Sequence, residues 1–221
     1  MRLNEIKIAK VPPAILGQVS LMIGQHCQPF LDEVGGDLHN YRLWRGLKNA
    51  PKDFITTVKC PVGRFPKDTH TEIHYAADRY FLRKFGVKYR SNSFFTTGSQ
   101  VTASEYGSSV WTPGGEVVVI PIGNFTWCWS SMLSDFYQGT EEAIEWPDDL
   151  GEDPDAFEVE AYFDKAVGEL CDRMKYKTTD LKRAIASNHE IMLHCKTAYF
   201  LNVDIANHLA EIGEMLQSGI L

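Results

Sequence analysis

The chain has 221 residues, enough for one large domain, and 44% of them are hydrophobic, as expected for a globular protein with a real core. The formal net charge is −7 and no Lys/Arg-rich run is present, which argues against nucleic acid as a partner, although one local basic groove stays open. No apolar run approaches the ~20 residues that span a bilayer, and the start MRLNEIKIAK lacks a signal-peptide core. We therefore expect a cytoplasmic protein with no membrane partner.

The chain gives no sign of a metal or disulfide framework. Its five cysteines are odd in number, scattered, and form no CxxC pair, so we expect reduced thiols. His70 and His74 have helical i, i+4 spacing in HTEIH, but Thr71 stands where a metalloprotease has glutamate, and no third ligand is apparent. A capped helix explains the same residues, and we expect no metal.

The first part of the chain reads as helix, strand, strand and helix. Apolar residues recur at helical spacing before Gly35, with Pro29 expected to kink or split the helix. Thr69 and Glu72 match a capping box, and Gly86 is a helix stop. The expected elements cover residues 12–34, 41–47, 54–58 and 69–86.

The stretch RSNSFFTTGSQVTASEYG, residues 90–107, organises the middle of the chain. Phe94 and Phe95 are strand formers, and a short helix follows the hydroxyl-rich turn. Side chains alternate along a strand, so we expect Thr96 and Thr97 to point opposite ways, one holding the next strand and the other facing a ligand.

The second half alternates strands with helices around an acidic break. Residues 139–158 are strongly acidic and contain two prolines, so we interpret them as an exposed loop or insertion. We expect strands at 116–122, 125–129, after Glu190 and at 197–203, a turn or short helix at 130–137, and helices at 155–174, 180–187 and after 204.

Three short motifs in chain order resemble those of the mono-ADP-ribosyltransferase family, in its arginine–serine–glutamate branch. They are Arg45-Gly46 near a strand end, Phe95-Thr96-Thr97-Gly98, and Glu190 opening a late strand. The resemblance extends from about residue 12 to 203, and the whole is similar to proteins of large tailed viruses, where such enzymes modify host proteins. It implies a single α+β domain over residues 1–221, with two small, mainly antiparallel sheets that form an NAD cleft flanked by helices.

The resemblance also implies roles for individual residues. Glu190 would stabilise the positive charge that develops when the nicotinamide–ribose bond breaks, while holding the ribose 2′-hydroxyl. Arg45 would clamp the pyrophosphate, and Thr96 would position Glu190 and the nicotinamide ribose. The remaining NAD contacts that we expect come from Gly46, Thr97, Arg90 and Asn188. NAD would be a substrate, the acceptor a host protein read by the loop at 176–189, and neither a metal nor a covalent nucleophile would be required.

Departures from the family pattern leave other functions open. Thr96 replaces the usual serine and keeps the hydroxyl, whereas Gly98 replaces the second serine. Members that modify arginine usually have glutamate two residues before the catalytic one, where this chain has Asn188, so arginine becomes doubtful as the acceptor. A non-enzymatic interaction module with a decayed site and an NAD glycohydrolase are the main alternatives. A Cys-His hydrolase fits less well, because no spacing pairs these residues.

Overall fold

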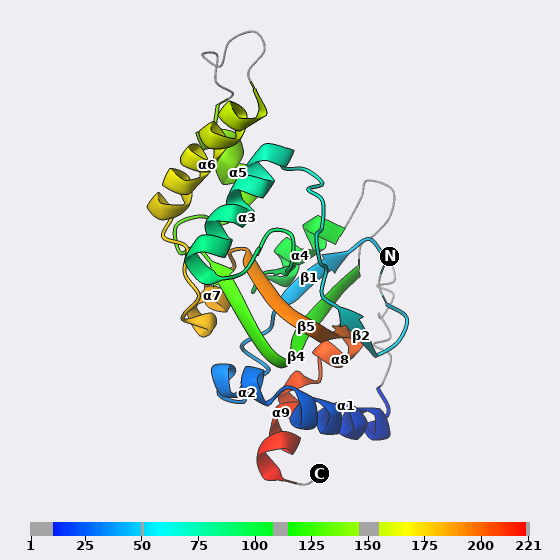
Figure 1. Cartoon of the computed structure of the whole chain (residues 1–221). Coiled ribbons are helices and arrows are strands. Elements are labelled where there is room, and N and C mark those ends of the chain that lie inside the picture. Colours follow the sequence, from blue (N-terminus) through cyan, green and yellow to red (C-terminus); the bar gives the residue numbers. More distant parts are fainter. Residues whose placement is uncertain (1–10, 50, 108–114, 146–154, 220–221) are drawn as a thin grey trace, which may run out of the picture.

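The computed structural model describes residues 11–49, 51–107, 115–145 and 155–219. Within these residues a single antiparallel sheet is surrounded by helices, an α+β arrangement (Figure 1). The strands are β1 (Trp44–Leu47), β2 (Ile55–Lys59), β3 (Phe94–Thr96), β4 (Gly115–Trp129) and β5 (Ile191–Asn202). The helices are α1 (Pro13–His26), α2 (Gln28–Val34), α3 (Thr71–Phe85), α4 (Gln100–Gly107), α5 (Phe136–Ala143), α6 (Ala156–Arg173), α7 (Leu181–Ser187), α8 (Val203–Ala206) and α9 (Leu209–Ser218).

The two long strands β4 and β5 form the centre of the sheet, whose order is β1-β4-β5-β2, with β3 also paired to β5. The register of β4 against β5 shifts between Ile122 and Phe125, as at a β-bulge, and such irregularities bend strands. The sheet curls far enough for β1 and β3, which pair with different strands, to meet through a bridge between Trp44 and Thr97.

The expectation of two separate sheets was wrong for the described residues. The two strands expected on either side of residues 123–124 form one continuous strand, β4. The two expected on either side of residue 196 likewise form one strand, β5. The first part of β4 pairs with β1 and the end of β5, and its last part pairs with the start of β5, which also carries β3. Two half-sheets thus share two unbroken strands.

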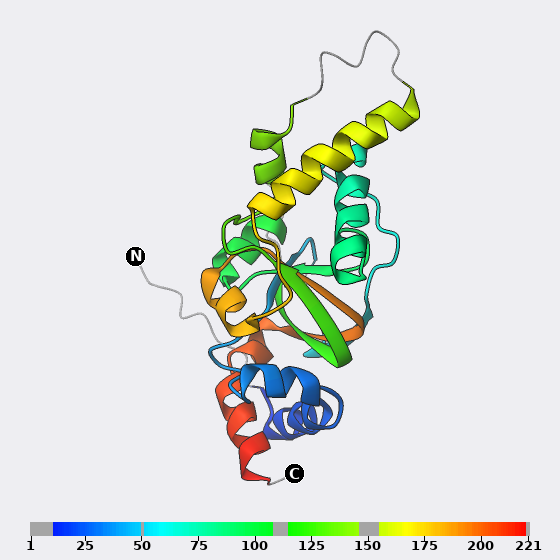
Figure 2. The same ribbon diagram turned by 60° about the vertical axis from the view of Figure 1, so that its left-hand side comes forward.

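Helices cover the sheet from two ends and enclose two apolar cores. Helices α1, α2 and α9 gather at one end, and α3, α5 and α6 at the other (Figure 2). The larger core lies between the sheet and the first group, and the smaller one between α3, α6 and the start of β5. None of the described helices is both long and apolar enough to cross a bilayer.

Most helix boundaries follow the sequence signals. The first helix splits at Cys27, with Pro29 in the first turn of α2, and Gly35 and Gly86 adopt left-handed conformations at the ends of α2 and α3. The capping box was wrong, because His70 precedes α3 and makes no side-chain cap bond.

The expectation of an acidic loop over 139–158 was also wrong at both ends. Helix α5 continues to Ala143, and α6 begins at Ala156 after its cap Asp155, which accepts a hydrogen bond from the backbone N–H of Glu158. Residues 146–154 lie outside the described residues.

Gly98 allows β3 to approach the end of α7 closely. A Cβ atom there would lie 1.8 Å from the carbonyl oxygen of Ile185, a backbone atom that cannot rotate away. We expect Gly98→Ala to lower the free energy of unfolding by about 1–3 kcal/mol, as over-packing does. Gly17→Ala in α1, where a Cβ meets nothing within 4 Å, should instead raise it by about 0.5–1 kcal/mol. Urea unfolding of both variants measures the two changes, and an unchanged stability for Gly98→Ala would contradict the close approach at Gly98.

Candidate functional site

A cavity of about 480 Å³ opens where β1, β3 and the start of β5 meet α4 and the loop before α3. It has the size of a small-molecule site. All the residues that the sequence nominated line it, namely Arg45, Gly46, Arg90, Thr96, Thr97, Asn188 and Glu190. The curl of the sheet brings these segments together, although more than 140 positions separate Arg45 from Glu190 in the chain.

The backbone around Glu190 is fixed from three directions. Thr96 donates its hydroxyl to the carbonyl of Ile191 (3.0 Å), and Thr97 donates to the carbonyl of Asn188 (2.7 Å). The backbone N–H of Glu190 itself donates to the carbonyl of Ser134 (2.8 Å). Both threonines thus use their hydroxyl protons within the protein and could meet a ligand only as acceptors. Thr96 positions Glu190 through the backbone rather than through its carboxylate.

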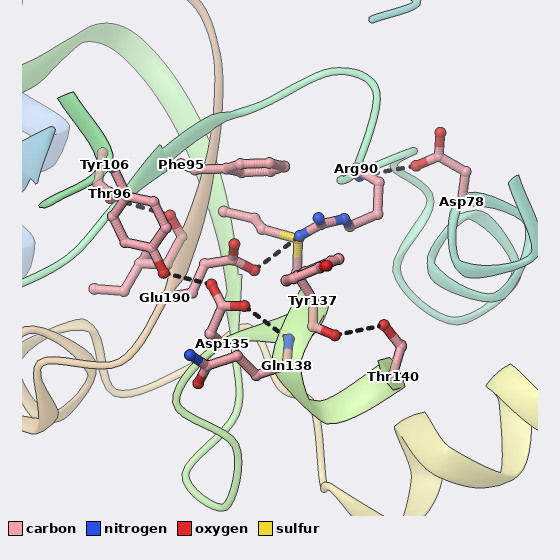
Figure 3. Close-up of polar contacts among 12 residues, drawn as sticks. Asp78, Arg90, Phe95, Thr96, Tyr106, Asp135, Tyr137, Gln138, Thr140 and Glu190 are labelled. Atoms are coloured by element: carbon pink, nitrogen blue, oxygen red, sulfur yellow. Dashed lines mark hydrogen bonds and ion pairs between the residues drawn. The ribbon is translucent and has the colours of Figure 1, made fainter. Parts of the chain in front are cut away.

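The carboxylate of Glu190 pairs with Arg90, which sequence reasoning gave only an auxiliary contact. Nη1 of Arg90 lies 2.8 Å from Oε1 of Glu190, and the two side chains are 6% and 13% exposed (Figure 3). The guanidinium also packs on the rings of Phe95 and Phe136, 4.4 and 4.5 Å from their centroids. Burial raises the pKa of Glu190, the charge of Arg90 opposes that rise, and the charge of Asp135 adds to it.

A second layer of contacts holds Arg90 in place. Oδ1 of Asp78 on α3 accepts hydrogen bonds from the backbone N–H groups of Arg90 (2.8 Å) and Ser91 (3.2 Å). His74, one turn earlier on α3, lies 3.0 Å from the hydroxyl of Ser91 through its Nε2. Burial lowers the pKa of His74 to about 4, so the imidazole is neutral at pH 7. The helix carrying HTEIH thus supports the site with a neutral histidine.

Two more arginines face the same cavity. Arg45 donates to the carbonyl of Phe95 (2.8 Å), and Arg64 donates to the carbonyl of Arg90 (2.8 Å) while stacking 3.8 Å above the Phe95 ring. Burial lowers the pKa of both, and the charges of Arg90 and Arg45 help to bring that of Arg64 to about 10. Guanidinium groups gathered in this way match the bidentate geometry of a phosphate or diphosphate. Arg64 was missed because it lies in a proline-rich loop without periodic pattern.

Asp135 and Tyr106 were also missed. Oδ1 of Asp135 accepts a hydrogen bond from the backbone N–H of Gln138 and caps α5 (3.0 Å), and Oδ2 accepts one from the hydroxyl of Tyr106 (2.5 Å). Burial raises the pKa of Tyr106, and its hydrogen bond to Asp135 raises it further. An aspartate ahead of a short helix is a cap signal, but nothing in the sequence connects it with a residue 55 positions later.

Asn188 lines the cavity and also has a backbone conformation that suits asparagine. It ends α7 with φ of +60°, a left-handed conformation that asparagine tolerates better than most residues. The loop expected at 176–189 therefore contains α7, which runs directly into Glu190. Among the described residues, no group of three or more His, Cys, Asp or Glu side chains is arranged to hold a metal ion.

Comparison of the chain with protein-family models, with curated proteins and with solved structures finds no match in any of the three. Function is therefore argued from the cavity itself.

The buried Arg90–Glu190 pair should make stability depend on pH once it is broken. Arg90→Met leaves Glu190 buried without its cation, which costs about 3–5 kcal/mol when the carboxylate is charged. Burial raises the pKa of Glu190 and Arg90 opposes that rise, so removing Arg90 raises the pKa further in the folded variant. Protonation then relieves the buried charge, so the loss relative to wild type should be largest at pH 8 and smaller at pH 5. Urea unfolding at both pH values measures it.

The double variant Arg90→Met/Glu190→Gln is the control for this experiment. It carries no buried charge at the pair, so its loss relative to wild type should be smaller and should change little between the two pH values. An equal loss for Arg90→Met at pH 8 and pH 5 would rule out an ionised, buried Glu190.

Proposed function

We propose that this protein is a mono-ADP-ribosyltransferase that cleaves the nicotinamide–ribose bond of NAD and transfers ADP-ribose to a host protein. The observation that carries the proposal is the convergence of Arg45, Thr96 and Glu190 on one cavity from three distant parts of the chain. The fold class adds little, because α+β domains host many unrelated functions.

The chemistry of the cavity suits the departure of nicotinamide. Breaking the glycosidic bond develops positive charge on the ribose, and a carboxylate fixed beside it lowers the barrier. Of the two carboxylate oxygens of Glu190, only Oε1 accepts a hydrogen bond from a described residue, Arg90, so Oε2 would be free to bind the ribose. Thr96 and Thr97 hold the backbone on both sides, so the carboxylate is preorganised.

The arginines suit the other half of NAD. Arg45 and Arg64 each use one nitrogen on a backbone carbonyl, and a guanidinium has five N–H donors, so donors remain for the pyrophosphate. Burial, and then the charges of Arg90 and Arg45, lower the pKa of Arg64, and an anionic ligand would offset the repulsion between these arginines. The acceptor protein would be read by the segment around α7, next to Glu190.

The decisive experiment incubates the protein with labelled NAD and a host lysate. Wild type should transfer label to protein, and Glu190→Gln should lose at least about 100-fold of that rate, because the amide cannot balance the charge on the ribose. Glu214→Gln on α9, an exposed glutamate that does not line the cavity, is the matched control and should keep the wild-type rate.

The other outcomes identify the alternatives. Free ADP-ribose without labelled protein would indicate an NAD glycohydrolase. Neither product, together with no thermal shift on adding NAD, would overturn the enzymatic proposal in favour of an interaction module.

Arg64 should contribute to NAD binding. Replacing it with methionine removes charge-assisted hydrogen bonds of about 1.5–3 kcal/mol, so the Kd for ADP-ribose should rise by at least about tenfold. Titration calorimetry measures this, with Arg173→Met, an exposed arginine of α6, as the control. An unchanged Kd for Arg64→Met would place the diphosphate elsewhere.

A further inference from the structure

Asp135 is a second acid at the cavity, and the proposed cleavage of NAD does not use it. It lies in the cavity lining with only 8% of its surface exposed. Ser134, its neighbour, accepts the backbone hydrogen bond from Glu190, so the chain itself fixes these two acids next to one another. The effect of Asp135 on the pKa of Glu190 reflects the same proximity.

The charge of Asp135 has no cation to balance it. Glu190 is paired with Arg90, whereas Asp135 makes no ion pair with any of the described residues. Its two partners are neutral donors, the hydroxyl of Tyr106 and a backbone N–H of α5. A carboxylate has about four lone-pair positions on its two oxygens, so each oxygen can still accept a hydrogen from a ligand. The cost of burying this charge without a cation favours a functional role.

The arrangement fixes Asp135 as firmly as a catalytic group needs. The α5 cap sets its backbone, and Tyr106 from α4 sets the rotation of its carboxylate (Figure 3). Figure 3 shows the carboxylate between the Tyr106 hydroxyl and Gln138 of α5, close to Glu190. Arg45 on β1 and Arg64 in the loop before α3, the arginines proposed to hold the diphosphate, lie on other elements than Asp135.

We propose that Asp135 is the acceptor-side base of the transfer reaction, a role that rests on the function proposed above. The C1′–N bond of NAD breaks, and its electron pair leaves with neutral nicotinamide. A lone pair of the acceptor then forms the new bond to C1′, and the N–H or O–H proton of the acceptor passes to Asp135. Atoms and charge balance, and no further reactant is needed. Because Asp135 is negative and takes up a proton, the acceptor is a nitrogen or oxygen nucleophile that carries a hydrogen, and not a carboxylate side chain.

This assignment predicts different effects on the two possible products, free ADP-ribose and ADP-ribosylated protein, which both form from the same oxocarbenium ion. Water attacks a formed oxocarbenium ion with little help, because breaking the C1′–N bond beside Glu190 is the slow step. A macromolecular acceptor needs its proton removed as it attacks, and general bases typically contribute 10²–10⁴-fold. Loss of Asp135 should therefore lower transfer much more than hydrolysis.

Asp135→Asn tests the role without disturbing the fold. Asparagine is as good a helix cap as aspartate, so its carbonyl oxygen keeps the bond from the backbone N–H of Gln138. Its NH2 group then faces Tyr106 and can donate to the hydroxyl oxygen, which also acts as an acceptor. We expect transfer of labelled ADP-ribose to lysate proteins to fall by at least about 100-fold, release of free ADP-ribose to change less than about tenfold, and the Kd for ADP-ribose to stay the same. Asp155→Asn makes the same change at the cap of α6 and should alter neither product.

Each other result overturns the assignment. Equal loss of both products would mean that Asp135 acts on bond cleavage or on the shape of the site. Retained transfer would mean that it is no base, and so would chemical identification of the modified side chain as a carboxylate. Failure of the proposed function looks different, because wild type itself would then transfer no label to protein, whether or not it released free ADP-ribose.

Discussion

The site depends on one electrostatic constraint: a carboxylate held out of water is costly unless a cation or hydrogen bonds compensate its charge. Glu190 meets this constraint through Arg90, which lies 2.8 Å away and is even more deeply buried. Arg90 in turn is held by two aromatic rings and by Asp78, which fixes its backbone from α3. The helix, the loop after it, β3 and β5 are therefore joined around one ion pair. The desolvation of such a pair offsets most of its attraction, so it adds little stability while it places charge with precision.

Charges of both signs line the cavity. Arg45 and Arg64 bring positive charge from β1 and from the loop before α3, and burial lowers the pKa of both. Asp135 brings negative charge from the start of α5, where it forms no ion pair with any of the described residues. Under the proposed function, the arginines would hold the diphosphate of NAD and Asp135 would face the nucleophilic acceptor, with Glu190 where the two meet.

The sequence predicted the positions of the elements well because helices and strands have periodic apolar faces. It could not predict how strands join, since two apolar runs interrupted by Gly123-Asn124 look alike whether they are two strands or one bulged strand. The candidate site was found from short motifs, and all of its residues share one cavity. Arg64 and Asp135 escaped because they lie in loops, where only the three-dimensional fold brings them near Glu190. The pairing of Glu190 with Arg90 escaped for the same reason, because 100 positions separate the two residues in the chain.

The departures from the family motifs have local structural reasons. Thr96 keeps a hydroxyl that the backbone at Ile191 requires, and Gly98 is the only residue that fits against the carbonyl of Ile185. Asn188 occupies a left-handed position that disfavours glutamate. These residues are therefore explained by how the chain holds Glu190, and they need not be marks of decay.

The cost of the buried charges argues in the same direction. Burying Glu190 with its cation Arg90 costs desolvation energy, and apolar side chains of similar volume would often fill the same space at equal or greater stability. Strained or costly groups persist where function requires them, and here several of them face one cavity. This concentration of cost supports the proposal of a catalytic site over that of an interaction module.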